Sequence, residues 1–112
     1  MTIAFELQGQ AFLALNGGPI FKFSPATSLI VRCETQEELD SMWERLSEGG
    51  KTQQCGWLTD KYGLSWQIVP AVLDEIMRDK DRRKSENAMK ALLQMVKIDI
   101  EALRKAYESP GL

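Results

Sequence analysis

"SLIVRCETQEELDSMWERLSEGG", residues 28–50, joins a short run of β-branched residues to an amphipathic helix. Residues 28–33 predict a strand, because β-branched side chains fit a pleated sheet. Thr35 is followed three residues later by Glu38, the spacing of a capping box at a helix start. Gly49 and Gly50 predict the helix end, since glycine accepts the left-handed conformation at low cost. The apolar residues at helical spacing between these ends are Leu39, Met42, Trp43 and Leu46.

Two more strands are predicted downstream, "CGWL" (55–58) and "LSWQIV" (64–69), around a "TDKYG" turn. Strand, helix, strand and strand over residues 27–70 predict a compact α+β module with its helix on one face of the sheet. From Pro70 onward, amphipathic spacing predicts three helical segments, with Asp99 as the cap of the last. The apolar residues of these segments are Val72, Ile76 and Met77, then Met89, Leu92, Leu93 and Val96, then Ile100, Leu103 and Ala106.

Upstream, "TIAFELQGQAFLALN" alternates apolar and polar residues on either side of Gln8 and Gly9, which predicts a β-hairpin. The following stretch, Asn16 to Pro25, is bounded by glycine and proline and reads as a loop. Its two aromatic residues, Phe21 and Phe23, are expected to pin it to the core.

Length and composition limit the possible functions. The 112 residues suit one domain, and the net charge of −2 with a pI near 5.2 supplies no basic field for nucleic acid. The chain has no histidine, the commonest metal ligand and general base. Its two cysteines fit a reduced cytosolic protein. No apolar run has the length of a membrane span, so we expect a cytoplasmic protein without a membrane partner.

Three phrases, "GGPIFKFSPATSLIVRCETQEELDSMWERLSEGG", "QCGWLTDKYGLSWQIVP" and "ALLQMVKIDIEAL", resemble the PhnB-like branch of the vicinal oxygen chelate superfamily. This superfamily includes glyoxalases, bleomycin resistance proteins and dihydroxybiphenyl dioxygenases, and the branch often carries the label 3-demethylubiquinone-9 3-methyltransferase. The resemblance implies an α+β fold of βαβββ modules, each a curved mixed sheet with a helix. The chain would then be a single glyoxalase-like domain over 1–112. Its parts would be a remnant hairpin of the first module (1–19), the second module (27–70) and a helical tail (71–112).

Members of this branch usually begin about one strand, one helix and another strand earlier, whereas this sequence starts at the last hairpin of the first module. Either the sequence is short at this end or the protein completes its sheet with another chain. The hairpin would otherwise leave an open strand edge. Since members of the superfamily form dimers or two-module monomers, the resemblance implies a homodimer, and it leaves open whether the two chains exchange elements or only abut.

The resemblance also suggests a site. In metal-dependent relatives, a glutamate ligand follows a D-x-x-G turn, and Gln67 takes its place after the turn at residues 60–63. Ser28 takes the place of a histidine ligand, and the corresponding position of the first module falls near Ala14 or Asn16. A neutral amide and a hydroxyl do not hold a divalent metal by themselves. We therefore predict neither a metal nor another cofactor.

Strand alternation places Ser65, Gln67 and Val69 on one face, and Trp66 and Ile68 on the face that meets the helix. Gln67 could orient a ligand in an apolar cup, or its amide could be satisfied within the protein. The predicted ligand-binding residues are Gln67, Ser65, Ser28, Asn16 and Trp57, with Trp57 stacking on a planar ligand at the mouth of the cup.

Three functions follow from these patterns. The first is metal-independent binding of a small molecule in the cup of the sheet. The second is a metal-dependent lyase, isomerase or dioxygenase-like enzyme of the same fold, for which the chain lacks histidine ligands. The third is a structural module whose cup is filled by its own side chains.

Overall fold

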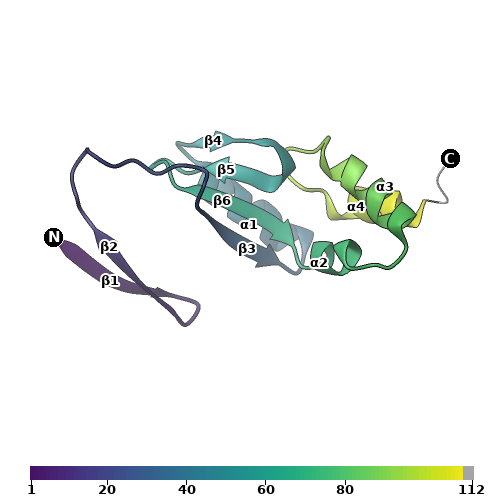
Figure 1. The fold of residues 1–112 in the computed structure, drawn as a ribbon, viewed down its shortest axis with the longest axis horizontal. Coiled ribbons are helices and arrows are strands. Elements are labelled where there is room, and N and C mark those ends of the chain that lie inside the picture. The colour runs from purple at the N-terminus through teal and green to yellow at the C-terminus, as the bar shows by residue number, and fades with distance from the viewer. Residues whose placement is uncertain (110–112) are drawn as a thin grey trace.

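A four-stranded mixed sheet with one helix behind it forms the centre of the molecule (Figure 1). The structure is a computed structural model that describes residues 1–109. Its strands are β1 (Thr2–Leu7), β2 (Gln10–Leu15), β3 (Ser28–Cys33), β4 (Lys51–Thr52), β5 (Trp57–Thr59) and β6 (Ser65–Pro70). Its helices are α1 (Gln36–Ser47), η1 (Gln54–Gly56, a 3₁₀ turn), α2 (Val72–Met77), α3 (Arg82–Leu92) and α4 (Ile100–Glu108).

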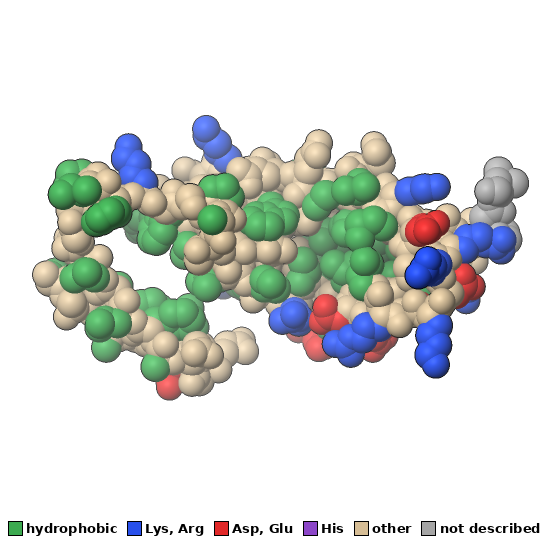
Figure 2. Space-filling view, in the orientation of Figure 1, with side chains coloured by type: hydrophobic (Ala, Val, Ile, Leu, Met, Phe, Trp, Pro, Cys, Tyr) green, Lys and Arg blue, Asp and Glu red, His purple; other side chains and the backbone are tan. Residues whose placement is uncertain are grey.

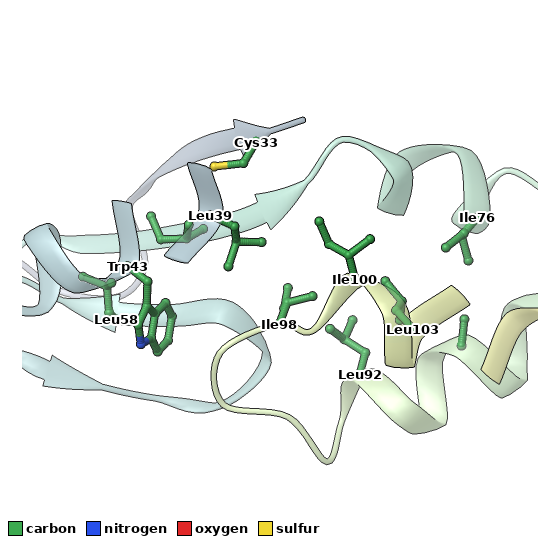
Figure 3. Packing of buried hydrophobic residues seen from close by; sticks show 11 residues of the cluster. Cys33, Leu39, Trp43, Leu58, Ile76, Leu92, Ile98, Ile100 and Leu103 are labelled. Carbon is green, nitrogen blue, oxygen red and sulfur yellow. The ribbon is translucent and has the colours of Figure 1, made fainter. Parts of the chain in front are cut away.

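The strand order in the central sheet is β3-β6-β5-β4, with β3 and β6 parallel and the other pairs antiparallel. One face packs on α1, where Leu58 of the sheet and Leu39 of the helix are fully buried (Figure 3). Ile68 of the sheet is also fully buried. Trp66 also packs against this core, as strand alternation predicts. The predicted α+β module of strand, helix, strand and strand is therefore confirmed.

Of the two hydrogen bonds in the predicted capping box at the start of α1, one forms and the other has a different donor. The Thr35 hydroxyl accepts a hydrogen bond from the Glu38 amide at 3.1 Å. The Glu38 carboxylate, however, accepts from the amide of Glu34 at 3.1 Å rather than from that of Thr35. The carboxylate thus reaches one residue further back than in a standard capping box. It gives a hydrogen-bond partner to the Glu34 amide, between β3 and α1.

The segment before β5 differs from the prediction, because Cys55 and Gly56 lie in η1 and not in a strand. Their amides donate to the carbonyl groups of Met95 and Val96, at 2.8 Å each. These partners belong to the helical tail, so a long-range contact draws the backbone out of the sheet. The short strand β4, which pairs with β5, was not predicted because it has only two polar residues.

The three helices of the tail lie at one end of the sheet (Figure 1). Leu92, Ile98 and Leu103 are buried there together with Ile100 (Figure 3). The Asp99 side chain accepts from the Ala102 amide, which confirms the predicted cap of α4. The expectation that Leu93 and Val96 continue the apolar stripe is wrong, because α3 ends at Leu92 and both side chains are exposed. No helix among residues 1–109 is long and apolar enough to cross a membrane.

Residues 1–27, the N-terminal arm, consist of the β1–β2 hairpin and the loop that leads to β3. The hairpin is confirmed, and both of its turn residues have positive φ, 50° at Gln8 and 79° at Gly9, as a two-residue hairpin turn requires. β1 and β2 form a separate sheet that stands away from the rest of the chain (Figure 1). The expectation that Phe21 and Phe23 pin the loop to the core is wrong: they are 88% and 62% exposed.

Candidate functional site

The face of the central sheet opposite α1, here called the open face, carries the predicted site. Strand alternation and the register of β3, β5 and β6 place eight side chains on it. They are Ser28, Ile30, Arg32, Trp57, Thr59, Ser65, Gln67 and Val69. In Figure 1, α1 lies behind the sheet and the open face is turned to the viewer; Figure 2 shows hydrophobic side chains gathered over the centre of this face.

Gln67 lies near the centre of this face and forms one hydrogen bond within the protein. Its amide nitrogen Nε2 donates to the Ser28 hydroxyl at 2.9 Å. Among residues 1–109, no group donates to its oxygen Oε1, and the side chain is half-buried. The register pairs Gln67 with Trp57, which is also half-buried. One side of the amide is thus satisfied by a neighbouring strand, and the acceptor side is free.

The other two predicted residues lie in different surroundings. Ser65 is opposite both Ser28 and Thr59 in the sheet and is only 2% exposed, so it forms the floor beside Gln67. Asn16 lies at the end of β2, where its backbone amide donates to the Met1 carbonyl. It lines a hollow between the arm and the Tyr62 turn rather than the open face. The structure therefore brings together Ser28, Ser65, Gln67 and Trp57, and it does not bring Asn16 to them.

The turn before β6 depends on Asp60, whose role the sequence reading did not assign. Its Oδ1 accepts from the amides of Tyr62 and Leu64, at 2.8 and 3.1 Å. Its Oδ2 accepts from the indole nitrogen of Trp66 at 2.8 Å. The carboxylate thereby fixes both the turn and the orientation of Trp66 on the helix side of β6. An aspartate three residues before glycine at a turn is a signal for such bonds to the backbone.

The residues of the open face do not fit a divalent metal. Amide and hydroxyl oxygens from Gln67 and Ser28 are weak ligands without carboxylate, imidazole or thiolate. In the described part of the chain, no group of three or more His, Cys, Asp or Glu side chains is arranged to hold a metal ion. Cys33 faces α1 and is buried, and burial, with a smaller contribution from Glu38, raises the pKa of its thiol.

A second hollow, of about 590 Å³, separates the hairpin from β3 and α1. The hairpin side is formed by Leu7, Gln8, Gln10 and Phe12. The opposite side is formed by Leu29, Ile30, Val31, Arg32, Met42, Leu46 and Trp66. The sequence reading missed this hollow, because it depends on where the arm lies relative to the sheet and not on any local pattern.

Comparisons with known proteins support the fold and identify the family. The model of a family described as 3-demethylubiquinone-9 3-methyltransferase matches residues 1–69, which run from the hairpin through most of β6. A solved structure of a PhnB protein from Bacillus cereus is 37% identical, with a TM-score of 0.59 over 63% of this chain and 64% of that chain. The helical tail after β6 lies beyond the family match.

A solved structure from Pseudomonas aeruginosa is 20% identical, with a TM-score of 0.50 over 62% of this chain and 60% of that one, and it supports the fold alone. No protein of curated function matches the chain. The chain spans less than two thirds of the length of both structural relatives. The match over residues 1–69 and the Bacillus cereus relative show that this chain belongs to the PhnB-like family described as 3-demethylubiquinone-9 3-methyltransferase.

Proposed function

We propose that the chain binds a small planar molecule on the open face, without a metal ion, through Gln67, Ser28 and Trp57. The observation that carries the proposal is the hydrogen bond from Gln67 Nε2 to Ser28 Oγ. It holds two polar groups side by side on a surface that also carries the apolar side chains of Ile30 and Trp57. Sparse, oriented polar groups in apolar surroundings are typical of small-molecule sites.

The polarity of this pair indicates the class of ligand. The Ser28 oxygen already accepts from Gln67, so its hydroxyl hydrogen is available to donate outward. Gln67 Oε1 is available as an acceptor. A complementary ligand would therefore carry an acceptor next to a donor, such as a ring carbonyl beside a hydroxyl, and its ring would stack on Trp57. The demethylubiquinone of the family description is a quinone of this kind.

Methyl transfer is not part of the proposal. Methyl-donor sites on parallel sheets use a glycine-rich turn between a strand and a helix to bring the backbone close to the donor. Here the strand β3 leads into α1 through Glu34 and Thr35, and both residues serve the helix cap. Binding of a hydroxyquinone-like ring needs no such turn.

We would test binding by NMR titration of the isotope-labelled Cys55→Ser protein, in which the more accessible thiol cannot add to a quinone. The probe is the tail-free 3-demethylubiquinone headgroup, titrated at a pH acidic enough to keep its ring hydroxyl protonated. Its methoxy counterpart, the tail-free ubiquinone headgroup, lacks this hydroxyl donor. We expect saturable shifts of the Gln67 side-chain amide and the Trp57 indole signals, with about tenfold weaker binding of the methoxy compound, the factor that about 1.4 kcal/mol gives.

The matched variants are Gln67→Leu and Gln94→Leu. Gln94 is an exposed glutamine in the helical tail, after α3. We expect binding to weaken about tenfold or more in Gln67→Leu, because an acceptor is lost, and to be unchanged in Gln94→Leu. Excess chelator should change nothing. Loss of binding with chelator would favour the metal-dependent enzyme, and the absence of any shift would contradict binding at this face.

A further inference from the structure

We propose that the helical tail holds Trp57 in position on the open face, so that ligand affinity depends on how the tail is docked. Trp57 belongs to the ligand site proposed above, so this role of the tail rests on the proposed function. The parts involved are η1 and residues 95–98, here called the link segment, which lie between α3 and α4. The family match ends at residue 69, so it does not include the tail that makes these contacts.

Both main-chain groups of Trp57 bond to the segment that precedes it. Its amide donates to the Gln54 carbonyl, and its carbonyl accepts from the Gln53 amide at 2.8 Å. Trp57 is also the first residue of β5, where it pairs with Gln67. The backbone at Trp57 therefore follows the shape of η1, and a change in this turn would move the indole relative to Gln67.

The backbone of η1 has a conformation that needs support from outside the turn. Cys55 has φ 61° and ψ 33°, in the left-handed region that residues other than glycine rarely adopt. Such a conformation is unfavourable and persists only where the surrounding structure holds it. The amides of Cys55 and Gly56 donate to two carbonyl groups of the link segment, at 2.8 Å each. The tail therefore stabilises the strained turn next to Trp57.

The tail also packs against η1 with no space left at Gly56. Gly56 is buried and has φ 81°. A Cβ there would lie 2.7 Å from Cδ1 of Ile98 and 2.9 Å from the carbonyl oxygen of Ile68. Ile98 is fully buried in the link segment (Figure 3), and Gln36 of α1 donates to its carbonyl at 3.1 Å. The turn thus fits between β6 and the tail, and the tail is itself fixed to α1.

Docking of the tail and binding of the ligand are therefore coupled. A side chain that is already held in its binding position loses less conformational freedom when the ligand arrives. Coupling between two sites is reciprocal, so a ligand that stacks on a fixed Trp57 also stabilises the docked tail. Loosening the tail should weaken binding, although the proposed ligand contacts all lie in the sheet.

The first test repeats the NMR titration with the 3-demethylubiquinone headgroup on full-length protein in the Cys55→Ser background, well below the unfolding midpoint. Gly56→Ala places a methyl group against Ile98 and should weaken binding about tenfold. Gly63→Ala is the matched control, because Gly63 has φ 91° but a Cβ there would meet nothing within 4 Å. Both variants strain a positive φ, so a loss of affinity in Gly56→Ala alone would come from its contact with the tail.

A second variant loosens the tail without touching η1. Gln36→Leu removes the bonds from α1 to the Ile98 carbonyl and from the Ile100 amide. It should weaken binding about threefold, whereas Gln94→Leu, exposed and outside the link segment, should again leave binding unchanged. A purely structural role of the tail would lower the unfolding midpoint of Gly56→Ala and Gln36→Leu without changing the affinity of the folded protein.

A measurement without ligand keeps the two proposals apart. We expect the heteronuclear NOE of the Trp57 indole to be lower in Gly56→Ala and Gln36→Leu than in the background protein, and unchanged in Gly63→Ala. If the headgroup binds none of these proteins, the proposed function fails, and the indole signal still decides whether the tail positions Trp57. An unchanged indole signal in both tail variants, or full affinity despite a changed signal, would overturn the role of the tail.

Discussion

At the scale of single residues, one side chain holds α1 to the tail. The amide nitrogen of Gln36 donates to Asp40 at 2.8 Å and to the carbonyl of Ile98 at 3.1 Å. Its oxygen accepts from the amide of Ile100 at 2.8 Å. Lys97 approaches Asp40 at 3.0 Å. These contacts join the start of α1 to the start of α4, although the two residues Gln36 and Ile100 are 64 positions apart in the sequence.

This cluster should make stability depend on pH. The hydrogen bond from Gln36, followed by that from Lys97, lowers the pKa of Asp40 below its ordinary 3.8. A carboxyl whose pKa is lower in the folded state stabilises the fold above the unfolded value, and this contribution is lost as pH falls through the folded value. We expect the urea midpoint of the natural protein to fall more between about pH 5 and about pH 3 than that of Asp40→Asn. An equal fall in both proteins would show that Asp40 contributes nothing. The effect should be small, because both partners are exposed to solvent.

The surroundings of Gln67 are only partly predictable from the sequence. The sequence left two alternatives, a ligand contact or an internally satisfied amide. The structure gives the amide nitrogen an internal partner in Ser28 and leaves the oxygen free. The internal hydrogen bond is thus confirmed for the amide nitrogen, and a ligand contact at the oxygen stays a proposal. The sequence could not decide this, because Ser28 is 39 residues away and becomes a neighbour only through the β3–β6 register.

At the scale of elements, the link from α1 to β4 packs tightly against the turn between β5 and β6. A Cβ on Gly50 would lie 2.0 Å from the carbonyl oxygen of Thr59 and 2.8 Å from the carbonyl carbon of Asp60. Both are backbone atoms and cannot swing aside. Here glycine is needed for close approach rather than for an unusual backbone angle.

We expect Gly50→Ala to destabilise the protein by about 2 kcal/mol or more, because the backbone must shift to accept the methyl group. Gly17→Ala is the matched control, since a Cβ there would meet nothing within 4 Å. It should leave the unfolding midpoint within about 0.5 kcal/mol of the natural protein. Denaturant unfolding measures both. A Gly50→Ala protein as stable as the control would mean that the helix and the turn are not held this close.

At the scale of the whole molecule, the chain is long and unevenly packed, with principal extents of 56 × 26 × 24 Å. The core lies between the central sheet, α1 and the tail, whereas the arm adds no fully buried residue. Local stability should follow this distribution, because segments with few buried contacts open most easily.

Amide hydrogen exchange should therefore be fastest in the arm. We expect amides of β1 and β2 to exchange nearly as in an unfolded chain, because no part of the arm is fully buried. The amides of Leu58 and Ile68, in the buried centre of the sheet, should be protected at least about tenfold more strongly. Arm amides protected as strongly as these two would contradict the prediction.

The sequence by itself determined the elements whose signals are local. The 28–33 strand, the helix that starts at Thr35, the hairpin at Gln8 and Gly9 and the cap at Asp99 depend on residues within a few positions of each other. The family resemblance is confirmed by the family model that matches residues 1–69.

Only the tertiary structure decided features that require contacts between distant residues. The 3₁₀ turn at Cys55 follows from bonds to Met95 and Val96, some 40 residues away. The placement of Asn16 away from Gln67, and the exposure of Phe21 and Phe23, follow from an arm that joins no strand of the central sheet. A hydrophobic pattern predicts that a side chain is buried, but it does not predict which surface covers that side chain. The covering surface comes from segments that are distant in the sequence and pack together only in the folded chain.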